Sequence, residues 1–116
     1  MSSKESVILK KMIRYCEDID YLMQKYGSDY STFQSDISFQ YSVSMCIIQI
    51  GELVTRLSEQ FIQDHKNIPW HEIRAMRNLH AHDYDRVDLS IVWNTVMEDI
   101  PDLKNALSVM IKKPNL

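Results

Sequence analysis

Apolar residues recur at alternating steps of three and four along most of this chain, and that spacing limits the fold more than any other feature of the sequence. It places the apolar side chains along one face of an α-helix. Among 116 residues there are only 2 Gly and 3 Pro, the residue types that most often interrupt helices. A mainly β chain and a disordered chain are both disfavoured, and the length predicts one helical domain of residues 1–116.

The first half of the chain divides into two predicted helices. Ser2 and Glu5 have the spacing of a capping box, so we expect a first helix over about residues 4–25 that stops at Gly27. After a polar connection, the apolar spacing predicts one long central helix over about residues 35–64.

The second half predicts two further helices. Pro69 begins a shorter third helix over about residues 70–84. Asp88 can cap a fourth, whose seven-residue apolar repeat keeps its phase on both sides of Pro101. Helices of these lengths with short connections pack as a bundle. The predicted fold is therefore all-α, an antiparallel up-and-down bundle of four main helices with the last one kinked or broken near Pro101.

Composition narrows the class of protein. The longest apolar run, Met45 to Ile48, is far shorter than the roughly 20 residues of a membrane span, so we expect a soluble, cytoplasmic protein. Cys16 and Cys46 lack metal-ligand spacing, which favours buried free thiols over a disulfide or a metal site. The net charge of -3 gives no overall attraction for nucleic acid, so an anionic substrate would need a local cluster of cations.

The third predicted helix separates apolar from polar residues when it is plotted at 100° per residue. Ile73, Met76 and Leu79 fall on one side, which we expect to face the core. The opposite side carries guanidinium, amide and imidazole groups, which could grip a phosphate while moving protons. The members of this polar face are His71, Arg74, Arg77, Asn78, Ala81 and His82.

Simpler explanations remain open from spacing alone. A solvated polar face needs no function, and His80 lies nearer the apolar side, which favours a packed histidine. His80 and His82 are two residues apart, so their side chains diverge on a helix and we expect neither a shared metal nor a cofactor. A glycine in the middle of a helix, such as Gly51, lowers the stability of the helix by about 1 kcal/mol relative to alanine. Close helix packing explains this glycine better than a catalytic role.

One segment resembles a family motif. Arg77-Asn78-Leu79-His80-Ala81-His82-Asp83-Tyr84 is similar to the motif of HepT-like HEPN-domain proteins, in which Arg-Asn is followed by three residues, His, one residue and Tyr. Ile50-Gly51-Glu52 resembles the second-helix signature of that family, and Ile68-Pro69-Trp70 the entry to its third helix. The similarity covers about residues 35–105 in the family's order and spacing. The segments that resemble the final helix are Val92-Trp93 and Asp99-Ile100-Pro101-Asp102-Leu103.

The resemblance implies a helical domain that forms a homodimer and acts as a metal-independent endoribonuclease. It also implies the toxin of a type VII-like toxin–antitoxin system, whose partner is a minimal nucleotidyltransferase. In the family this antitoxin silences the ribonuclease by transferring AMP to the tyrosine of the motif, which corresponds to Tyr84. Arg77, Asn78 and His82 match the functional positions of the motif.

The residue types suit RNA cleavage without a metal, in which the 2′-hydroxyl attacks the adjacent phosphate. His82 could accept or donate the proton, since an imidazole titrates near neutral pH. Arg77 could oppose the charge developing on the phosphate, and Asn78 could orient the imidazole or the RNA backbone. Two such faces opposed across a twofold axis would supply acid and base together.

His71, Arg74 and Glu52 are predicted to support substrate binding. We expect the dimer interface to include the polar face of the third helix and the region around Gly51. A rival interpretation is a non-catalytic HEPN module that binds a nucleotidyltransferase or a nucleotide without cutting RNA.

Overall fold

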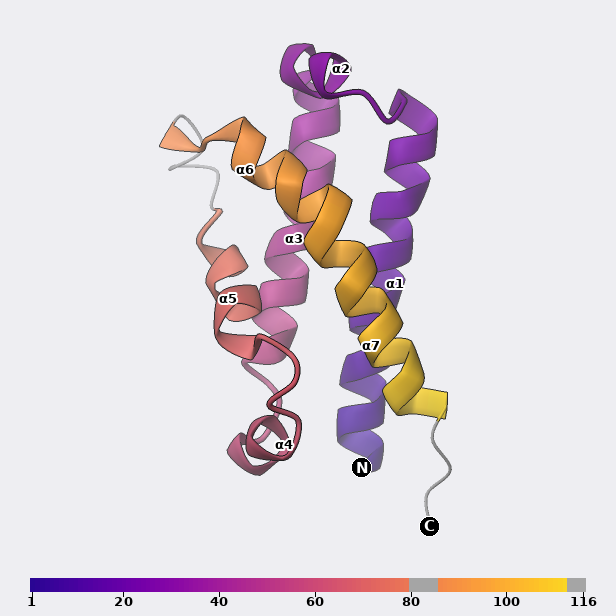
Figure 1. Cartoon of the computed structure of the whole chain (residues 1–116), viewed down its shortest axis with the longest axis vertical. Coiled ribbons are helices and arrows are strands. Elements are labelled where there is room, and N and C mark those ends of the chain that lie inside the picture. The colour runs from indigo at the N-terminus through magenta and orange to yellow at the C-terminus, as the bar shows by residue number, and fades with distance from the viewer. Residues whose placement is uncertain (80–85, 113–116) are drawn as a thin grey trace.

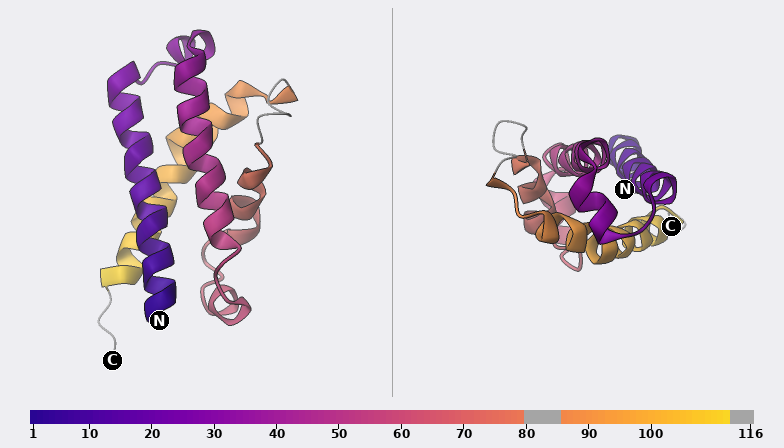
Figure 2. Two further views of the ribbon diagram at one scale, coloured as in Figure 1. Left: turned by 180° about the vertical axis from the view of Figure 1, so that it is seen from behind. Right: turned by 90° about the horizontal axis from the view of Figure 1, so that it is seen from above.

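The computed structural model describes residues 1–79 and 86–112, and within them all regular structure is helical, which confirms the all-α class. Helices α1 (Ser3–Tyr26) and α3 (Ile37–Val54) lie side by side and run in opposite directions (Figure 1). Seen from behind, the same pair forms one wall of the molecule (Figure 2). Helix α5 (Trp70–Ala75) packs against the lower part of α3, and the C-terminal helices cover the opposite wall.

Helix α1 matches its prediction to within one residue at each end. The Ser2 hydroxyl accepts from the Glu5 amide at 3.1 Å, and the Glu5 carboxylate accepts from the Ser2 amide at 3.1 Å, which completes the predicted capping box. Gly27 ends the helix with φ 94°, a backbone conformation that side chains disfavour. The apolar spacing placed six residues on one face, of which Tyr26 is half-buried and five are buried, Leu9, Met12, Cys16, Ile19 and Met23.

The predicted polar connection contains a short helix, α2 (Tyr30–Ser35), that the apolar spacing did not indicate. Asp29 caps its first turn, and its one buried residue, Phe33, is fully covered. The amide of the buried Gln40 donates to the carbonyl groups of Phe33 and Gln34 at 2.8 and 3.0 Å. These bonds give partners to carbonyls that the end of a helix otherwise leaves open.

The prediction of one helix over residues 35–64 is wrong. A turn that ends at Ser58 separates α3 from α4 (Glu59–Asp64), and the Ser58 hydroxyl caps α4. Leu57 and Phe61 are nevertheless buried, as the spacing predicted. The apolar period continues through a turn because it records which residues are buried, not whether the helical hydrogen bonds are continuous.

The C-terminal segment contains the predicted interruption near Pro101. α6 (Leu89–Asn94) passes into a π-helical turn, η3 (Thr95–Asp99), and then into α7 (Ile100–Lys112). Proline has no N–H and its ring crowds the carbonyl of the preceding turn, which a widened turn accommodates.

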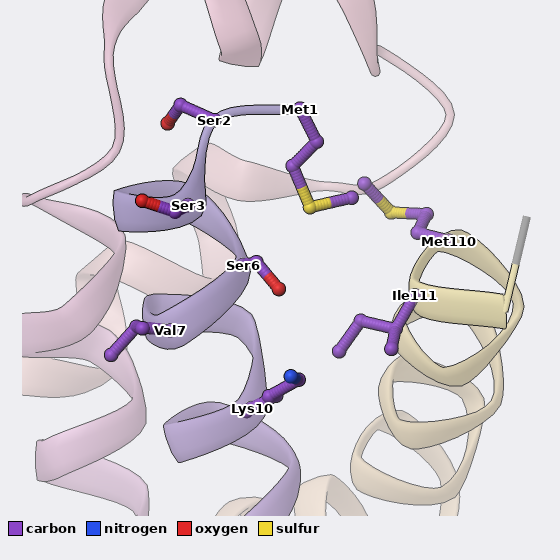
Figure 3. A pocket seen from close by; sticks show the side chains of 8 residues that line it. All are labelled: Met1, Ser2, Ser3, Ser6, Val7, Lys10, Met110 and Ile111. Atoms are coloured by element: carbon purple, nitrogen blue, oxygen red, sulfur yellow. The ribbon is translucent and has the colours of Figure 1, made fainter. Parts of the chain in front are cut away.

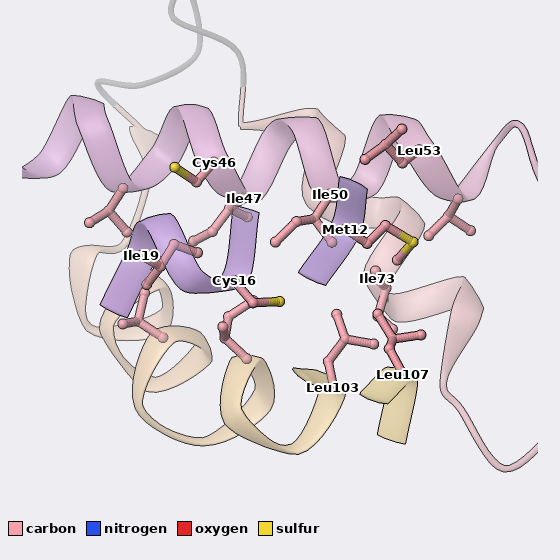
Figure 4. Packing of buried hydrophobic residues seen from close by; sticks show 14 of the residues in the cluster. Met12, Cys16, Ile19, Cys46, Ile47, Ile50, Leu53, Ile73, Leu103 and Leu107 are labelled. Atoms are coloured by element: carbon pink, nitrogen blue, oxygen red, sulfur yellow. The ribbon is translucent and has the colours of Figure 1, made fainter. Parts of the chain in front are cut away.

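The core lies between α1, α3 and α7, where their buried side chains interdigitate (Figure 4). Both cysteines are free and buried, as predicted. Burial raises the pKa of the Cys16 thiol to about 12 and that of Cys46 to about 11. Both thiols are therefore protonated and inert at neutral pH.

By length and composition alone, α3 could cross a membrane, although 56% of its residues are buried within the chain. A core helix of a soluble protein passes the same test, so this observation is weak evidence for a membrane span.

Candidate functional site

The predicted polar face begins on α5, which two buried residues hold in place. Trp70 is buried, and its indole N–H donates to the His65 carbonyl at 2.9 Å. Ile73 is buried one turn later, in the core that Figure 4 draws. After α5 the chain tightens into a 3₁₀ turn, η1 (Met76–Asn78), and then leaves the helical conformation at Leu79, with φ -77° and ψ 55°.

The helix predicted over residues 70–84 is thus interrupted at Leu79, and its predicted continuation from residue 80 lies outside the described residues. Among the described residues, the plot at 100° per residue applies to α5, because η1 is a tighter 3₁₀ turn. His80, His82 and Tyr84 lie outside the described residues, so their predicted positions on the helix wheel do not follow from this structure.

Within the described residues, α5 and η1 are amphipathic. Ile73 is buried, and Met76 and Leu79 are half-buried against the core, as expected for the apolar side. On the polar side, three of the residues singled out from the sequence are exposed and Arg77 is half-buried. The exposed three are His71, Arg74 and Asn78.

Gly51 fixes the distance between α3 and this segment. A methyl group on Gly51 would lie 2.7 Å from the backbone nitrogen of Arg77 and 3.0 Å from the carbonyl oxygen of Ile73. Real side chains do not approach a backbone so closely, so the backbones of α3 and η1 can touch only at a glycine. The contact is within one chain, as close packing predicted, and Gly51 itself is buried and unavailable to a partner.

Glu52 follows Gly51 on α3 and is half-buried. It is one helical step from the residue that touches η1, about 100° around the helix axis. Its carboxylate forms no ion pair with any of the described residues. The structure thus brings Gly51, Arg77 and the end of α5 together and leaves Glu52 beside them.

The arrangement suits an anionic ligand. Arg74 and Arg77 are three residues apart on a short helical segment, and guanidinium groups bind phosphate oxygens through paired N–H donors. No group of three His, Cys, Asp or Glu side chains that could hold a metal occurs among residues 1–79 and 86–112.

Comparisons with known proteins agree with the motif. The family described as ribonuclease HepT-like matches residues 12–110. The chain is 35% identical over 83 residues to a protein of Thermococcus cleftensis named probable ribonuclease HepT, which covers 72% of this chain and 76% of the relative.

This chain belongs to the HepT-like ribonuclease family. It is also 30% identical over 104 residues to a Methanocaldococcus jannaschii protein named as a putative RNase, across 90% of this chain and 88% of the relative. A third such RNase, from Caldanaerobacter subterraneus, is 28% identical over 106 residues, across 90% of this chain and 92% of the relative. No solved structure matches the chain.

The family match includes both the helical core and the polar segment of this HepT-like protein. Sequence reasoning missed one feature of its surface, an apolar stripe on the outer side of α3. Ile37, Tyr41 and Met45 are 60%, 52% and 56% exposed. Their i, i+4, i+8 spacing can be read from the sequence. The helix prediction, however, interpreted the buried residues of α3 as the whole apolar face of that helix.

A second missed feature of this HepT-like protein is a hollow between α5 and the C-terminal helices. Two adjoining cavities of about 380 and 390 Å³ share Glu72, Met76 and Asp99 in their walls. Asp102 lines one of them and Asp88 the other. This side of α5 is therefore acidic and apolar, in contrast with the side that carries Arg74.

A further cavity lies between the start of α1 and the end of α7 (Figure 3). It measures about 360 Å³ and is lined by serine, methionine and aliphatic side chains together with Lys10. It offers no catalytic pair among the described residues and is separate from α5.

Proposed function

We propose that this chain is a metal-independent endoribonuclease whose site consists of Arg77, Asn78 and His82. The 2′-oxygen bonds to phosphorus while the bond from phosphorus to the 5′-oxygen breaks. One proton passes from the 2′-hydroxyl to a base, and another is donated to the departing 5′-oxygen. The products are a 2′,3′-cyclic phosphate and a 5′-hydroxyl end, and Arg77 opposes the negative charge that develops on the phosphoryl oxygens.

The match of residues 12–110 to the ribonuclease HepT-like family carries this proposal, and the contact between Gly51 and the backbone of Arg77 supports the location of the site. A catalytic group must be held close to its productive position, and groups supported by rigid elements meet that need best. At Gly51 the backbone of η1 lies directly against the long helix α3. His71 and Arg74 are exposed on the same segment, and in this proposal they bind flanking parts of the RNA.

The proposed active form is a homodimer. One polar face supplies one imidazole base, and a second copy supplies the acid. The exposed stripe of Ile37, Tyr41 and Met45 supports this proposal, because a soluble protein gains by covering large exposed apolar side chains that lie together. The interface then runs along the first half of α3, at Ile37, Tyr41 and Met45, and includes neither Gly51 nor the end of α3.

The proposed biological role is that of a cytoplasmic toxin in a type VII-like toxin–antitoxin pair. A minimal nucleotidyltransferase silences it by AMP transfer. The Tyr84 oxygen attacks the α-phosphorus of ATP, loses its proton and releases pyrophosphate. The attached phosphate and nucleoside would compete with RNA for Arg77.

Cleavage of a labelled RNA tests the proposed reaction. We expect activity to persist in EDTA and the upstream fragment to end in a 2′,3′-cyclic phosphate. His82→Ala should lower the rate by about 100-fold or more with little change in stability, because it removes a proton-transfer group. Arg77→Ala should lower the rate through loss of transition-state charge stabilisation.

Lys66→Ala, which removes an exposed cation elsewhere, is the matched control and should leave the rate unchanged. His80→Ala should affect stability more than rate. Wild-type cleavage by His82→Ala, or loss of activity on chelation, would contradict the reaction. Binding of RNA without cleavage would favour the rival non-catalytic module.

Light scattering at micromolar concentration tests the dimer. Met45→Lys places a charge on the exposed stripe and should give an inactive monomer. Val109→Lys is the control, because Val109 is equally exposed, at 57% against 56%, but lies on α7. A wild-type monomer that cleaves RNA would exclude the two-chain cleft.

Intact mass measurement tests the switch at Tyr84. The protein is incubated with its partner nucleotidyltransferase and ATP, and we expect added mass in units of AMP. Tyr84→Phe should prevent the addition, whereas Tyr41→Phe, on the outer side of α3, should not. Unchanged modification of Tyr84→Phe would place the acceptor elsewhere.

A further inference from the structure

A groove between α1 and α3 concentrates positive charge in this acidic protein. It has a volume of about 390 Å³. Lys11 and Arg14 from α1 line it together with Arg56, which follows α3. We call it the basic groove; its remaining lining residues are Tyr15, Asp18, Gln49 and Leu53.

Two of the three cations of the basic groove form no ion pair with the described residues, and the third forms only an exposed one. Neither Lys11 nor Arg56 forms an ion pair with any described residue. Arg14 is 3.4 Å from Asp18, but both side chains are exposed, at 77% and 44%. Exposed pairs of this kind contribute little free energy, so a phosphate could displace the carboxylate at small cost.

The walls of the groove are helices that the hydrophobic core holds together. Met12 and Cys16 next to its lining residues are fully buried, and Leu53 packs in the same core. The half-buried Tyr15 also lines the groove and places an aromatic side chain beside the cations. Cations with an aromatic ring along a groove are the usual means by which proteins hold single-stranded nucleic acid.

The position of the groove relates it to the proposed cleavage site. Leu53 and Gln49 face α1 from one side of α3, whereas Gly51 meets η1 on the other side. A helix with its side chains is about 10 to 12 Å wide. A short RNA strand can pass over α3 and reach both sites. The opposite hollow, with Glu72, Asp99 and Asp102, would repel the same strand.

We propose that the basic groove is a second RNA-binding site, which holds backbone phosphates of single-stranded RNA on one side of the scissile bond. This proposal rests on the proposed ribonuclease function. The groove takes no part in the chemistry. Its cations raise the affinity of the protein for longer RNA strands, which the net charge of -3 does not attract.

Binding of a non-cleavable strand tests the groove. The probe is a labelled 2′-O-methyl oligouridine of about 12 nucleotides, which suits one groove and has no 2′-hydroxyl to attack. The triple variant Lys11→Gln, Arg14→Gln, Arg56→Gln should weaken binding by about tenfold or more at 50 mM salt and reduce the slope of log affinity against log salt by about 2, the value for three lost contacts to a single strand.

The matched control is Lys25→Gln, Lys66→Gln, Lys112→Gln, which makes the same change in net charge at exposed cations outside the groove. It should change the affinity by less than about twofold. An equal loss in both triple variants, an unchanged salt slope in the groove variant, or no binding of the probe by the wild type would overturn the proposal.

Cleavage separates this proposal from the one on which it rests. The groove variant should raise KM for a long RNA and leave kcat and the cleavage of a dinucleotide unchanged. If the wild type binds RNA through the groove but cuts no RNA, the groove proposal holds and the ribonuclease proposal is refuted. Cleavage of long RNA with unaltered KM in the variant would retain the ribonuclease and refute the groove.

Discussion

The α1–α3 pair and the α5–η1 segment are built in opposite ways. α1 has 24 residues and α3 has 18, and both begin with a side-chain cap. α5 and η1 together span only residues 70–78, and Pro69 at the start of α5 provides no cap. Isolated helices shorter than about 12 residues are marginal in water. The segment that carries Arg77 therefore keeps its shape only because the long helices support it.

The difference indicates where stability and function reside. Burial between α1, α3 and α7 supplies the folding free energy. The α5–η1 segment buries only Trp70 and Ile73, and its polar side chains are exposed except for the half-buried Arg77. The long helices hold this segment in position through the buried Trp70 and Ile73 and through the backbone contact at Gly51. Substitutions in the two regions should then separate loss of stability from loss of activity.

The largest expected effect is on stability alone. Phe39 is fully buried, with ring centroids 4.7 Å from Tyr26 and 5.1 Å from Phe33. Phe39→Ala should lower the free energy of unfolding by about 3 to 5 kcal/mol. Cleavage per folded molecule should not change, because Phe39 lies at the end of α3 remote from α5 (Figure 1). Urea unfolding followed by circular dichroism, with cleavage measured where the variant is folded, checks both statements.

Tyr21→Ala is the control for Phe39→Ala, because Tyr21 is 63% exposed on α1. It should change stability by no more than about 0.5 kcal/mol. If Phe39→Ala does not fold, Ile19→Val should still cost about 0.5 to 1.5 kcal/mol without altering cleavage. A folded core variant with lower activity per molecule would show that the two regions are not separable.

The next largest effect should appear in both stability and cleavage rate. Gly51→Ala places a methyl group 2.7 Å from the Arg77 nitrogen, so η1 must move. Overpacking of this kind costs about 1 to 3 kcal/mol. The displacement of Arg77 should also lower the cleavage rate, by about 100-fold for a shift near 1 Å. Kinetics on the folded variant distinguish this loss from unfolding.

Gly27→Ala is the matched glycine control. A methyl group there meets no atom within 4 Å, but φ 94° is strained for alanine. It should lower stability by about 1 to 3 kcal/mol and leave cleavage unchanged. Wild-type activity in Gly51→Ala would mean that the position of Arg77 does not limit the reaction.

The sequence predicted the bounds of α1 well and the ends of the second and third predicted helices poorly, for a physical reason. Apolar spacing reports burial, which is what holds α1 together, and the capping box at Ser2 and Glu5 has a local pattern. The end of the third helix at Leu79 has no such pattern, since Leu79 still packs on the core after the helical conformation is lost. The contact at Gly51 joins residues distant in sequence, so no local pattern predicts it. The only sign of it in the sequence is a glycine in the middle of a helix.

The motif residues are a different case. Arg74, Arg77 and Asn78 were chosen by residue type and family pattern, and the structure places them on one short segment. The family assignment is confirmed. The roles of His82 and Tyr84 stay predictions, because both lie outside the described residues.

A smaller effect concerns the cap of α3. The Asp36 carboxylate accepts from the Phe39 amide at 3.2 Å. Asp36→Ala should lower stability by about 1 kcal/mol, whereas Asp36→Asn, which keeps an acceptor, should lower it much less. Neither should alter cleavage. Equal losses in the two variants, measured by urea unfolding, would mean that charge and not the cap hydrogen bond stabilises this end of α3.

The smallest expected effect is a pH dependence at Asp88, which caps α6 just beyond the motif. The hydroxyl and the amide of Ser90 donate to this carboxylate and hold the pKa of Asp88 below its usual range. A lowered pKa in the folded state adds stability above the unfolded pKa, about 3.9, and that stability is lost as pH falls through the folded pKa. Asp88→Asn still caps but does not titrate. The stability difference between wild type and Asp88→Asn should therefore be largest near pH 7 and shrink below about pH 4, and Ser90→Ala should weaken this trend. Urea unfolding from neutral to acidic pH measures it, and a difference that stays constant across the range would exclude a charged cap at this end of the motif.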